Sequence, residues 1–106
     1  QGPVNARLLW NAGITYGFGT DTSFHPRRTL KAELKALNLT FSEQDIIKIM
    51  TTGTAKAVGL ESEIGTLEAG KVADVVILDG NPLEDLYDLL NVDLVIRGGE
   101  IVIDKL

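Results

Sequence analysis

Residues 14–21 have the sequence Ile-Thr-Tyr-Gly-Phe-Gly-Thr-Asp. Bulky side chains occupy the even positions, and threonine or glycine occupies the odd positions from Thr15 to Gly19. Because successive side chains of a strand point to opposite faces, this alternation predicts a strand with one crowded face and one bare face. Asp21 continues the odd parity, so we expect its side chain on the bare face, at the carboxyl end of the strand.

Helices are predicted on both sides of this strand. Apolar residues spaced by about four positions favour a short helix over residues 4–12, and Gly13 suits the position after its last turn. After the strand, the pattern predicts an amphipathic helix over residues 30–38 and a second helix that begins at Ser42. The threonine- and glycine-rich run over residues 51–54 is expected to break or redirect this second helix.

The character of the sequence changes near residue 60, from helical patterns to short β-rich runs separated by glycines. Three strands are predicted in this part: residues 72–78, 92–96 and 101–103. The Gly98-Gly99 pair suits a two-residue hairpin between the last two strands. Asn81-Pro82 is expected to start a further helix between the first two strands. The chain therefore divides into a helix-dominated part and a sheet-dominated part.

Length, charge and composition narrow the class of protein. The 106 residues are enough for about one domain but too few for a complete (β/α)8 barrel, which needs roughly 200. An excess of Asp and Glu (15) over Lys and Arg (10) gives a net charge of −5, which argues against nucleic acid or an anionic membrane surface as a partner. The absence of cysteine excludes disulfides and cysteine-ligated metal sites.

The N-terminal sequence bears on what kind of chain this is. It begins Gln1-Gly2-Pro3, with neither an initiator methionine nor the apolar core of a signal peptide. No apolar run approaches the roughly 20 residues needed to span a bilayer. We therefore expect a fragment or processed product that is cytoplasmic and has no membrane partner.

Asp21 and His25 are the candidate functional residues. A carboxylate at the carboxyl end of a strand, next to glycines that allow close approach, is where α/β and barrel folds place catalytic groups. The alternative is that Asp21 is an ordinary loop residue or a helix cap. His25, the single histidine, could be a metal ligand, a general base or a contact to substrate. The alternative is a loop histidine that simply precedes Pro26.

Three motifs, in this order, closely resemble the C-terminal part of the metal-dependent amidohydrolase superfamily. The motifs are Gly19-Thr20-Asp21, residues 51–60 (TTGTAKAVGL) and residues 65–78 (GTLEAGKVADVVIL). The branch they resemble is that of the imidazolonepropionase-related and prolidase-like amidohydrolases. The likeness continues through residues 81–85 and 95–99, so it covers essentially the whole chain.

The resemblance implies an α/β fold that is the C-terminal fragment of a (β/α)8 amidohydrolase barrel. Residues 1–58 would then be the terminal barrel segment, with the last barrel helix, the eighth strand and the helices after it. Residues 60–106 would be the C-terminal part of the small β-sandwich that the family builds from both chain ends. Within this part, Asp74 is expected to serve a turn or the start of a strand.

The resemblance also implies a role for Asp21. It matches the family's strand-eight aspartate, which binds the catalytic metal and takes the proton from the attacking water. A carboxylate suits both tasks, because a divalent cation lowers the pKa of bound water and a free carboxylate oxygen can accept the proton. Zinc is the metal that the resemblance favours. For His25, the residue itself, and not the resemblance, suggests a contact to the substrate at most.

Most of the family's metal ligands have no counterpart in this chain. The family also uses a His-x-His on the first strand, a carboxylated Lys or a Glu on the fourth, and His residues on the fifth and sixth. A catalytic zinc ordinarily takes three protein ligands, and a single Asp with one nearby His cannot supply them. We therefore expect the chain alone to bind no catalytic metal and to be inactive.

Two functions remain open at this point. In the first, the chain is part of an enzyme that hydrolyses a C–N bond in a small-molecule substrate, either a cyclic amide or a dipeptide. In the second, it is a stand-alone, non-catalytic module that retains the family's fold for self-association or partner binding. A lone barrel strand and an incomplete sandwich leave strand edges unpaired. We therefore expect the chain to associate with a partner that covers these edges. The partner would be another copy, in a dimer or an intertwined oligomer, or a missing N-terminal portion.

Overall fold

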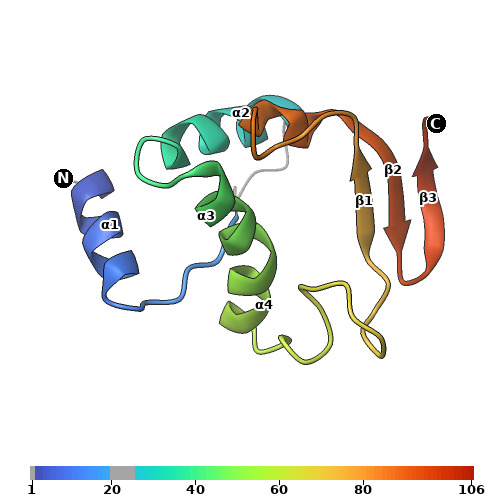
Figure 1. The fold of residues 1–106 in the computed structure, drawn as a ribbon, viewed down its shortest axis with the longest axis horizontal. Helices are drawn as coiled ribbons and strands as arrows, with labels where there is room; N and C mark the ends of the chain where they lie inside the picture. Colours follow the sequence, from blue (N-terminus) through green and yellow to red (C-terminus); the bar gives the residue numbers. More distant parts are fainter. Residues whose placement is uncertain (1, 20–25) are drawn as a thin grey trace.

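The computed structural model describes residues 2–19 and 26–106. The elements in chain order are α1 (Gly2–Asn11), α2 (Pro26–Leu37), α3 (Glu43–Lys48), the π-helical turn η1 (Ile49–Gly53), α4 (Thr54–Ala57), β1 (Val75–Leu78), the 3₁₀ helix η2 (Leu86–Leu90), β2 (Val92–Arg97) and β3 (Glu100–Asp104). The helices gather at one end of an elongated molecule of 42 × 30 × 28 Å, and the sheet stands at the other end (Figure 1). The predicted order, with helices first and strands last, is confirmed.

The hydrophobic core lies among the helices. Its buried members come from α2, the α2–α3 connection, α3, η1 and η2: Leu34, Phe41, Ile46, Ile49 and Leu86. Half-buried aromatic side chains from the N-terminal segment, Trp10, Tyr16 and Phe18, pack against them. Because Leu86 belongs to η2, the core joins the helical part to the sheet part. Arg27 strengthens this junction, since its guanidinium donates to the Leu90 carbonyl over 2.7 Å.

The second predicted helix starts where the sequence indicated but is not broken. Ser42 caps α3, and its hydroxyl accepts from the Asp45 amide over 3.2 Å. Instead of a break at residues 51–54, the helix widens into the π-turn η1 and continues as α4. Backbone angles stay right-handed helical at Gly53 and Thr54, so the three elements follow one another without interruption.

The three strands form one antiparallel sheet in the order β1-β2-β3. Gly98 and Gly99 both have positive φ, 57° and 84°, as a tight hairpin turn between β2 and β3 requires. β1 begins at Val75 rather than at residue 72 as predicted. The reason is that the Val72 amide donates to the Glu63 carbonyl (2.9 Å) and the Asp74 amide donates back to Val72 (3.0 Å), so these residues form turns instead of ladder bonds.

The helix predicted to start at Asn81-Pro82 is also different. Asn81 instead organises a turn, in which its side-chain oxygen accepts from the Leu83 amide over 3.0 Å. The helical residues begin at Leu86 and form the short 3₁₀ helix η2, because Asp85 caps it by accepting from the Tyr87 amide.

Residues 14–19, predicted as a lone strand with unpaired edges, form no ladder hydrogen bonds with another described segment and are therefore not assigned as a strand. The predicted alternation nevertheless holds from Thr15 to Gly19: Tyr16 and Phe18 are half-buried, and the odd positions are exposed. The segment therefore behaves as a single unpaired strand laid on the helices.

Among the described residues, no helix is both long and apolar enough to cross a membrane.

Candidate functional site

Asp21 and His25, the two residues that the sequence singled out, lie outside the described residues. The structure describes the chain up to Gly19, two positions before Asp21, and from residue 26 onward. The described residues nearest to Asp21 are those of the segment that leads to it, residues 14–19, and the helices that support this segment.

Two hydrogen bonds hold this segment against the helices. The Tyr16 hydroxyl donates to the Ala6 carbonyl of α1 over 3.0 Å, and the Phe18 amide donates to the Thr54 hydroxyl of α4 over 2.9 Å. Residues from two helices that are far apart in sequence thus hold the segment at Tyr16 and Phe18.

Glycines allow the segment to lie directly on the helix. A Cβ atom at Gly53 would stand 2.5 Å from the Tyr16 carbonyl oxygen, which is closer than real Cβ contacts come. On the other side, a Cβ at Gly17 would stand 3.3 Å from the Ala57 methyl group. Backbone therefore packs on backbone here, and a larger residue at position 53 would push the segment away.

An aromatic cluster fills the space under the even face. The ring centroids of Trp10, Tyr16 and Phe41 are 5.3–6.3 Å apart, and Phe41 meets the other two edge to face. Such pairs are favourable beyond the area that they bury. The odd face, with Thr15, Gly17 and Gly19, is left exposed. This is the bare face that the sequence predicted, up to the point where the described residues end.

The described residues do not form a metal centre. Among residues 2–19 and 26–106, no group of three or more His, Cys, Asp or Glu side chains could hold a metal ion. Several carboxylates serve structure instead. Asp45 pairs with Arg7 at 3.1 Å, and Asp74 accepts from the Gly98 amide at 2.8 Å, which confirms its predicted role at a turn.

Among the described carboxylates, Glu68 is the one whose pKa clearly departs from its usual value. A hydrogen bond from the Thr66 hydroxyl, followed by contact with Lys71, lowers the pKa of Glu68 below its usual value. The side chain is exposed and forms a turn within residues 66–71, so this shift belongs to local structure and not to a reaction site.

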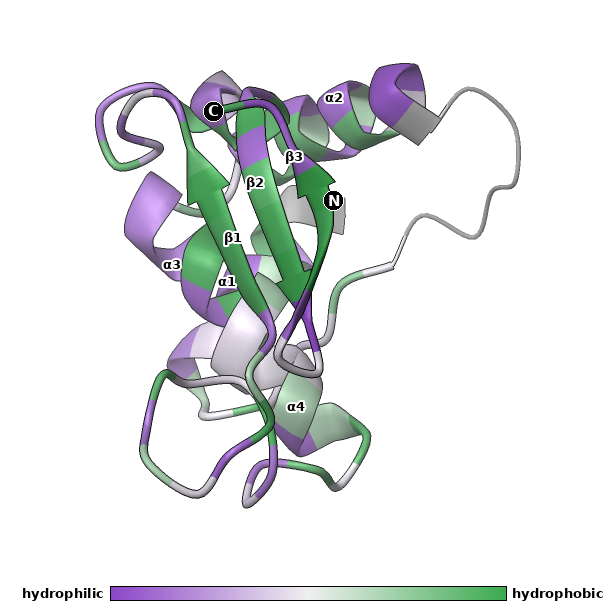
Figure 2. Cartoon of the chain, turned by 90° about the vertical axis from the view of Figure 1, so that its right-hand side faces the viewer, coloured by the Kyte–Doolittle hydropathy of each residue, from purple (hydrophilic) through white to green (hydrophobic). Residues whose placement is uncertain are grey.

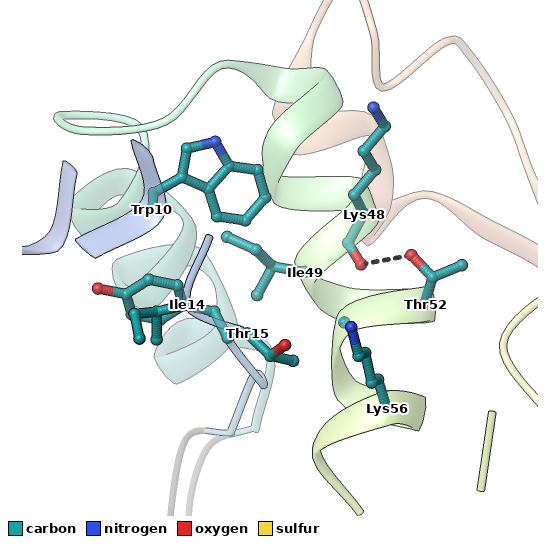
Figure 3. A pocket seen from close by; sticks show the side chains of 9 residues that line it. Trp10, Ile14, Thr15, Lys48, Ile49, Thr52 and Lys56 are labelled. Carbon is teal, nitrogen blue, oxygen red and sulfur yellow. Dashed lines mark hydrogen bonds between the residues drawn. The ribbon is translucent and has the colours of Figure 1, made fainter. Parts of the chain in front are cut away.

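Sequence reasoning missed a hollow on the helix side of the segment. It has a volume of about 260 Å³ and lies between the end of α1, residues 14–16 and the α3–η1–α4 helix (Figure 3). Trp10, Ile14 and Ile49 make it apolar, while Lys48 and Lys56 stand on its helix side. No spacing of residues along the sequence indicates this hollow, because its two walls are more than 30 residues apart.

A family model and curated relatives match almost the whole chain. The model of the amidohydrolase family matches residues 2–102. An imidazolonepropionase of Shouchella clausii is 31% identical over 109 aligned positions, which cover 96% of this chain and 24% of the relative. A guanine deaminase of Escherichia coli is 34% identical and is covered to 22%, with 83% of this chain aligned. The chain thus spans about a quarter of the length of the curated relatives it matches.

Solved structures agree with this. A Xaa-Pro dipeptidase with bound methionine in its active site superposes with a TM-score of 0.79 at 32% identity, covering 93% of this chain and 25% of that one. An amidohydrolase of Thermotoga maritima superposes with a TM-score of 0.73 at 30% identity, covering 96% of this chain and 26% of that one. Both likenesses run through the helices and the sheet together.

Proposed function

The chain belongs to the amidohydrolase family, in its imidazolonepropionase- and prolidase-like branch, and from that premise we propose that it supplies the C-terminal portion of an enzyme that hydrolyses a C–N bond. The observation that carries the proposal is the family match over residues 2–102, which spans both the helical part and the sheet. The proposed substrate class is a small-molecule amide, either a cyclic amide or a dipeptide.

Asp21 is the proposed catalytic residue of this chain. In the proposal its carboxylate is a ligand of a divalent metal, with zinc favoured, and accepts a proton from the water that attacks the substrate. The exposed end of the preceding segment supports this placement, because a Cβ at Gly19 would meet nothing within 4 Å among the described residues, which leaves room for a ligand beside the backbone. His25 is proposed to contact the substrate.

The rest of the metal site would have to come from outside this chain. Members of the family are generally metal-dependent, and the described residues offer no cluster of ligands. A catalytic zinc usually takes three protein ligands. We therefore expect residues 1–106 alone to be inactive.

The two parts of the chain take different places in this proposal. Residues 1–58 are proposed as the terminal segment of a (β/α)8 barrel, and residues 60–106 as part of a small β-sandwich. The sheet supports the second assignment. Val95 lies on the face opposite to the buried Leu94, and its cross-strand neighbours Val76 and Ile103 are 54% and 43% exposed. Figure 2 shows this apolar outer face of the sheet without a covering helix from the described residues.

A second candidate function is a non-catalytic module for self-association or partner binding. The observation that favours it is the exposed apolar surface, which includes Val4 and Leu8 on α1 and, on β3, Ile101, Val102 and Ile103. Exposed apolar patches of this kind mark interaction sites when they are large enough. In the first proposal the remaining polypeptide covers it, and in this one a partner or a second copy does.

Experiments on the full-length product of the gene that encodes this chain distinguish the two candidate functions. We expect its purified form to contain a stoichiometric divalent metal and to hydrolyse at least one of three probes: imidazolonepropionate, guanine or a Xaa-Pro dipeptide. Asp21→Asn should lower kcat by at least about a thousandfold, in line with the loss of a positioned general base. A wild-type protein without metal and without hydrolysis would support the non-catalytic module.

A further inference from the structure

The Thr54 hydroxyl connects the π-turn with the segment that leads to Asp21. It donates to the Ile49 carbonyl over 2.6 Å and accepts from the Phe18 amide over 2.9 Å. A hydroxyl has one proton, so donation to Ile49 orients its lone pairs toward the Phe18 N–H. The two bonds therefore support each other.

The π-turn is what brings this hydroxyl into place. The Ile49 carbonyl accepts both the backbone amide and the side-chain hydroxyl of Thr54, five residues later. This wider turn replaces an ordinary helical turn just where residues 16–18 cross the helix. π-turns of this kind occur often at functional sites.

The contact leaves little freedom to the segment. Gly53 stops the Tyr16 carbonyl from moving closer, because the two backbones already touch. The bond to Thr54 stops Phe18 from moving away. Among the backbone amides of residues 15–19, that of Phe18 donates a hydrogen bond to another described residue, Thr54.

We infer that Thr54 is a positioning residue for the reaction, whose hydroxyl fixes the segment three residues before Asp21. The inference rests on the proposed function, because it gives Thr54 a purpose only if Asp21 takes part in catalysis. Thr54 itself does not touch the substrate in this scheme. It acts through the backbone of Phe18.

The test uses the full-length protein and three variants. Thr54→Val removes the hydroxyl at nearly constant volume, and Thr54→Ser keeps the hydroxyl. Thr51→Val is the matched control, because the Thr51 hydroxyl also donates to a carbonyl of the same helix, that of Ile47, and does not accept the hydrogen bond of the Phe18 amide. The measurements are the hydrogen-exchange rate of the Phe18 amide, together with kcat and KM on the probe that the wild type hydrolyses.

We expect Thr54→Val to raise the Phe18 exchange rate by roughly fivefold to tenfold, the size expected for one net hydrogen bond. The value of kcat should fall by a similar factor while KM stays within about twofold. Thr54→Ser should restore both values, and Thr51→Val should change neither. If Thr54→Val does not fold, Thr54→Ala removes the hydroxyl without adding a methyl group next to the amide.

Each other outcome has a distinct meaning. Faster exchange at Phe18 with unchanged kcat overturns the inference and leaves Thr54 a merely structural contact. Unchanged exchange also overturns it, whatever happens to kcat. A wild-type protein that hydrolyses none of the probes overturns the proposed function, and with it the catalytic purpose of Thr54, while the exchange rates still decide whether the hydroxyl holds the segment.

Discussion

The carboxylate of Asp74 accepts a hydrogen bond from the backbone amide of Gly98 over 2.8 Å, across 24 positions of sequence. The neighbouring Gly99 amide donates to the Ala73 carbonyl over 2.9 Å. The residues that precede β1 thus hold both amides of the β2–β3 hairpin turn. This contact ties the free end of the sheet to the start of its first strand.

Asp74→Ala is therefore expected to destabilise the sheet. It leaves the Gly98 amide without its partner, at a cost of about 1 kcal/mol for an exposed site. Chemical denaturation monitored by circular dichroism measures the difference. Asp79→Ala is the control, because it keeps the hydrogen bond from the Asp79 backbone amide to the Asn91 carbonyl and leaves the contact between Asp74 and Gly98 intact. Equal stability of the two variants would contradict the role given to Asp74.

For Gly53→Ala, helix propensity and the contact with Tyr16 predict changes of opposite sign in the free energy of unfolding. Gly53 has helical backbone angles, φ −64° and ψ −47°, so alanine on its own should stabilise the helix by about 1 kcal/mol. The added methyl group would instead meet the Tyr16 carbonyl at 2.5 Å. Because backbone cannot give way as a flexible side chain does, we expect a net loss of about 1–3 kcal/mol.

The measurement is again the free energy of unfolding. Gly19→Ala serves as the control, since a Cβ at Gly19 meets nothing within 4 Å among the described residues. A Gly53→Ala protein that is more stable than the wild type would show that the segment does not lie on the helix as described.

Features that depend on a few neighbouring residues were predictable from the sequence. The Ser42 cap and the Gly98-Gly99 hairpin are of this kind, because each depends on residues within one turn. The contacts of residues 14–19 with α1 and α4 were not predictable, since they depend on segments far away in sequence. The π-turn at η1 was expected only as a disturbance, because its shape depends on the hydroxyl of Thr54 and on contact with Phe18.

The candidate site divides in the same way. The bare odd face follows from the alternation of residues 15–19 and is confirmed up to Gly19. The roles of Asp21 and His25 come from the family resemblance and stay predictions. The hollow beside Trp10 could not be predicted, because it forms only when α1 packs against the distant α3–η1–α4 helix.

The acidity of Glu68 gives a prediction about pH. A depressed pKa in the folded chain means that the ionised carboxylate stabilises the turn above the ordinary range of a glutamate pKa. This contribution is lost as the pH falls through the lowered pKa.

An NMR titration of the Glu68 side chain should find a pKa below that of an unstructured glutamate. Thr66→Val, which removes the largest cause, should raise it toward the ordinary value, whereas Thr40→Val, far from this turn in sequence, should leave it unchanged.

The outer face of the sheet predicts self-association when residues 1–106 are expressed alone. Val76, Val95 and Ile103 form one cross-strand row, and β3 is an exposed edge strand, so two copies can bury these surfaces against each other. Size-exclusion chromatography with light scattering should give a mass of at least two chains.

Ile103→Thr should shift the equilibrium toward the monomer by reducing the apolar area of the row. Leu67→Thr is the matched control, because Leu67 is 76% exposed but lies in a loop outside the sheet. A well-folded monomer at millimolar concentration would show that the row does not drive association.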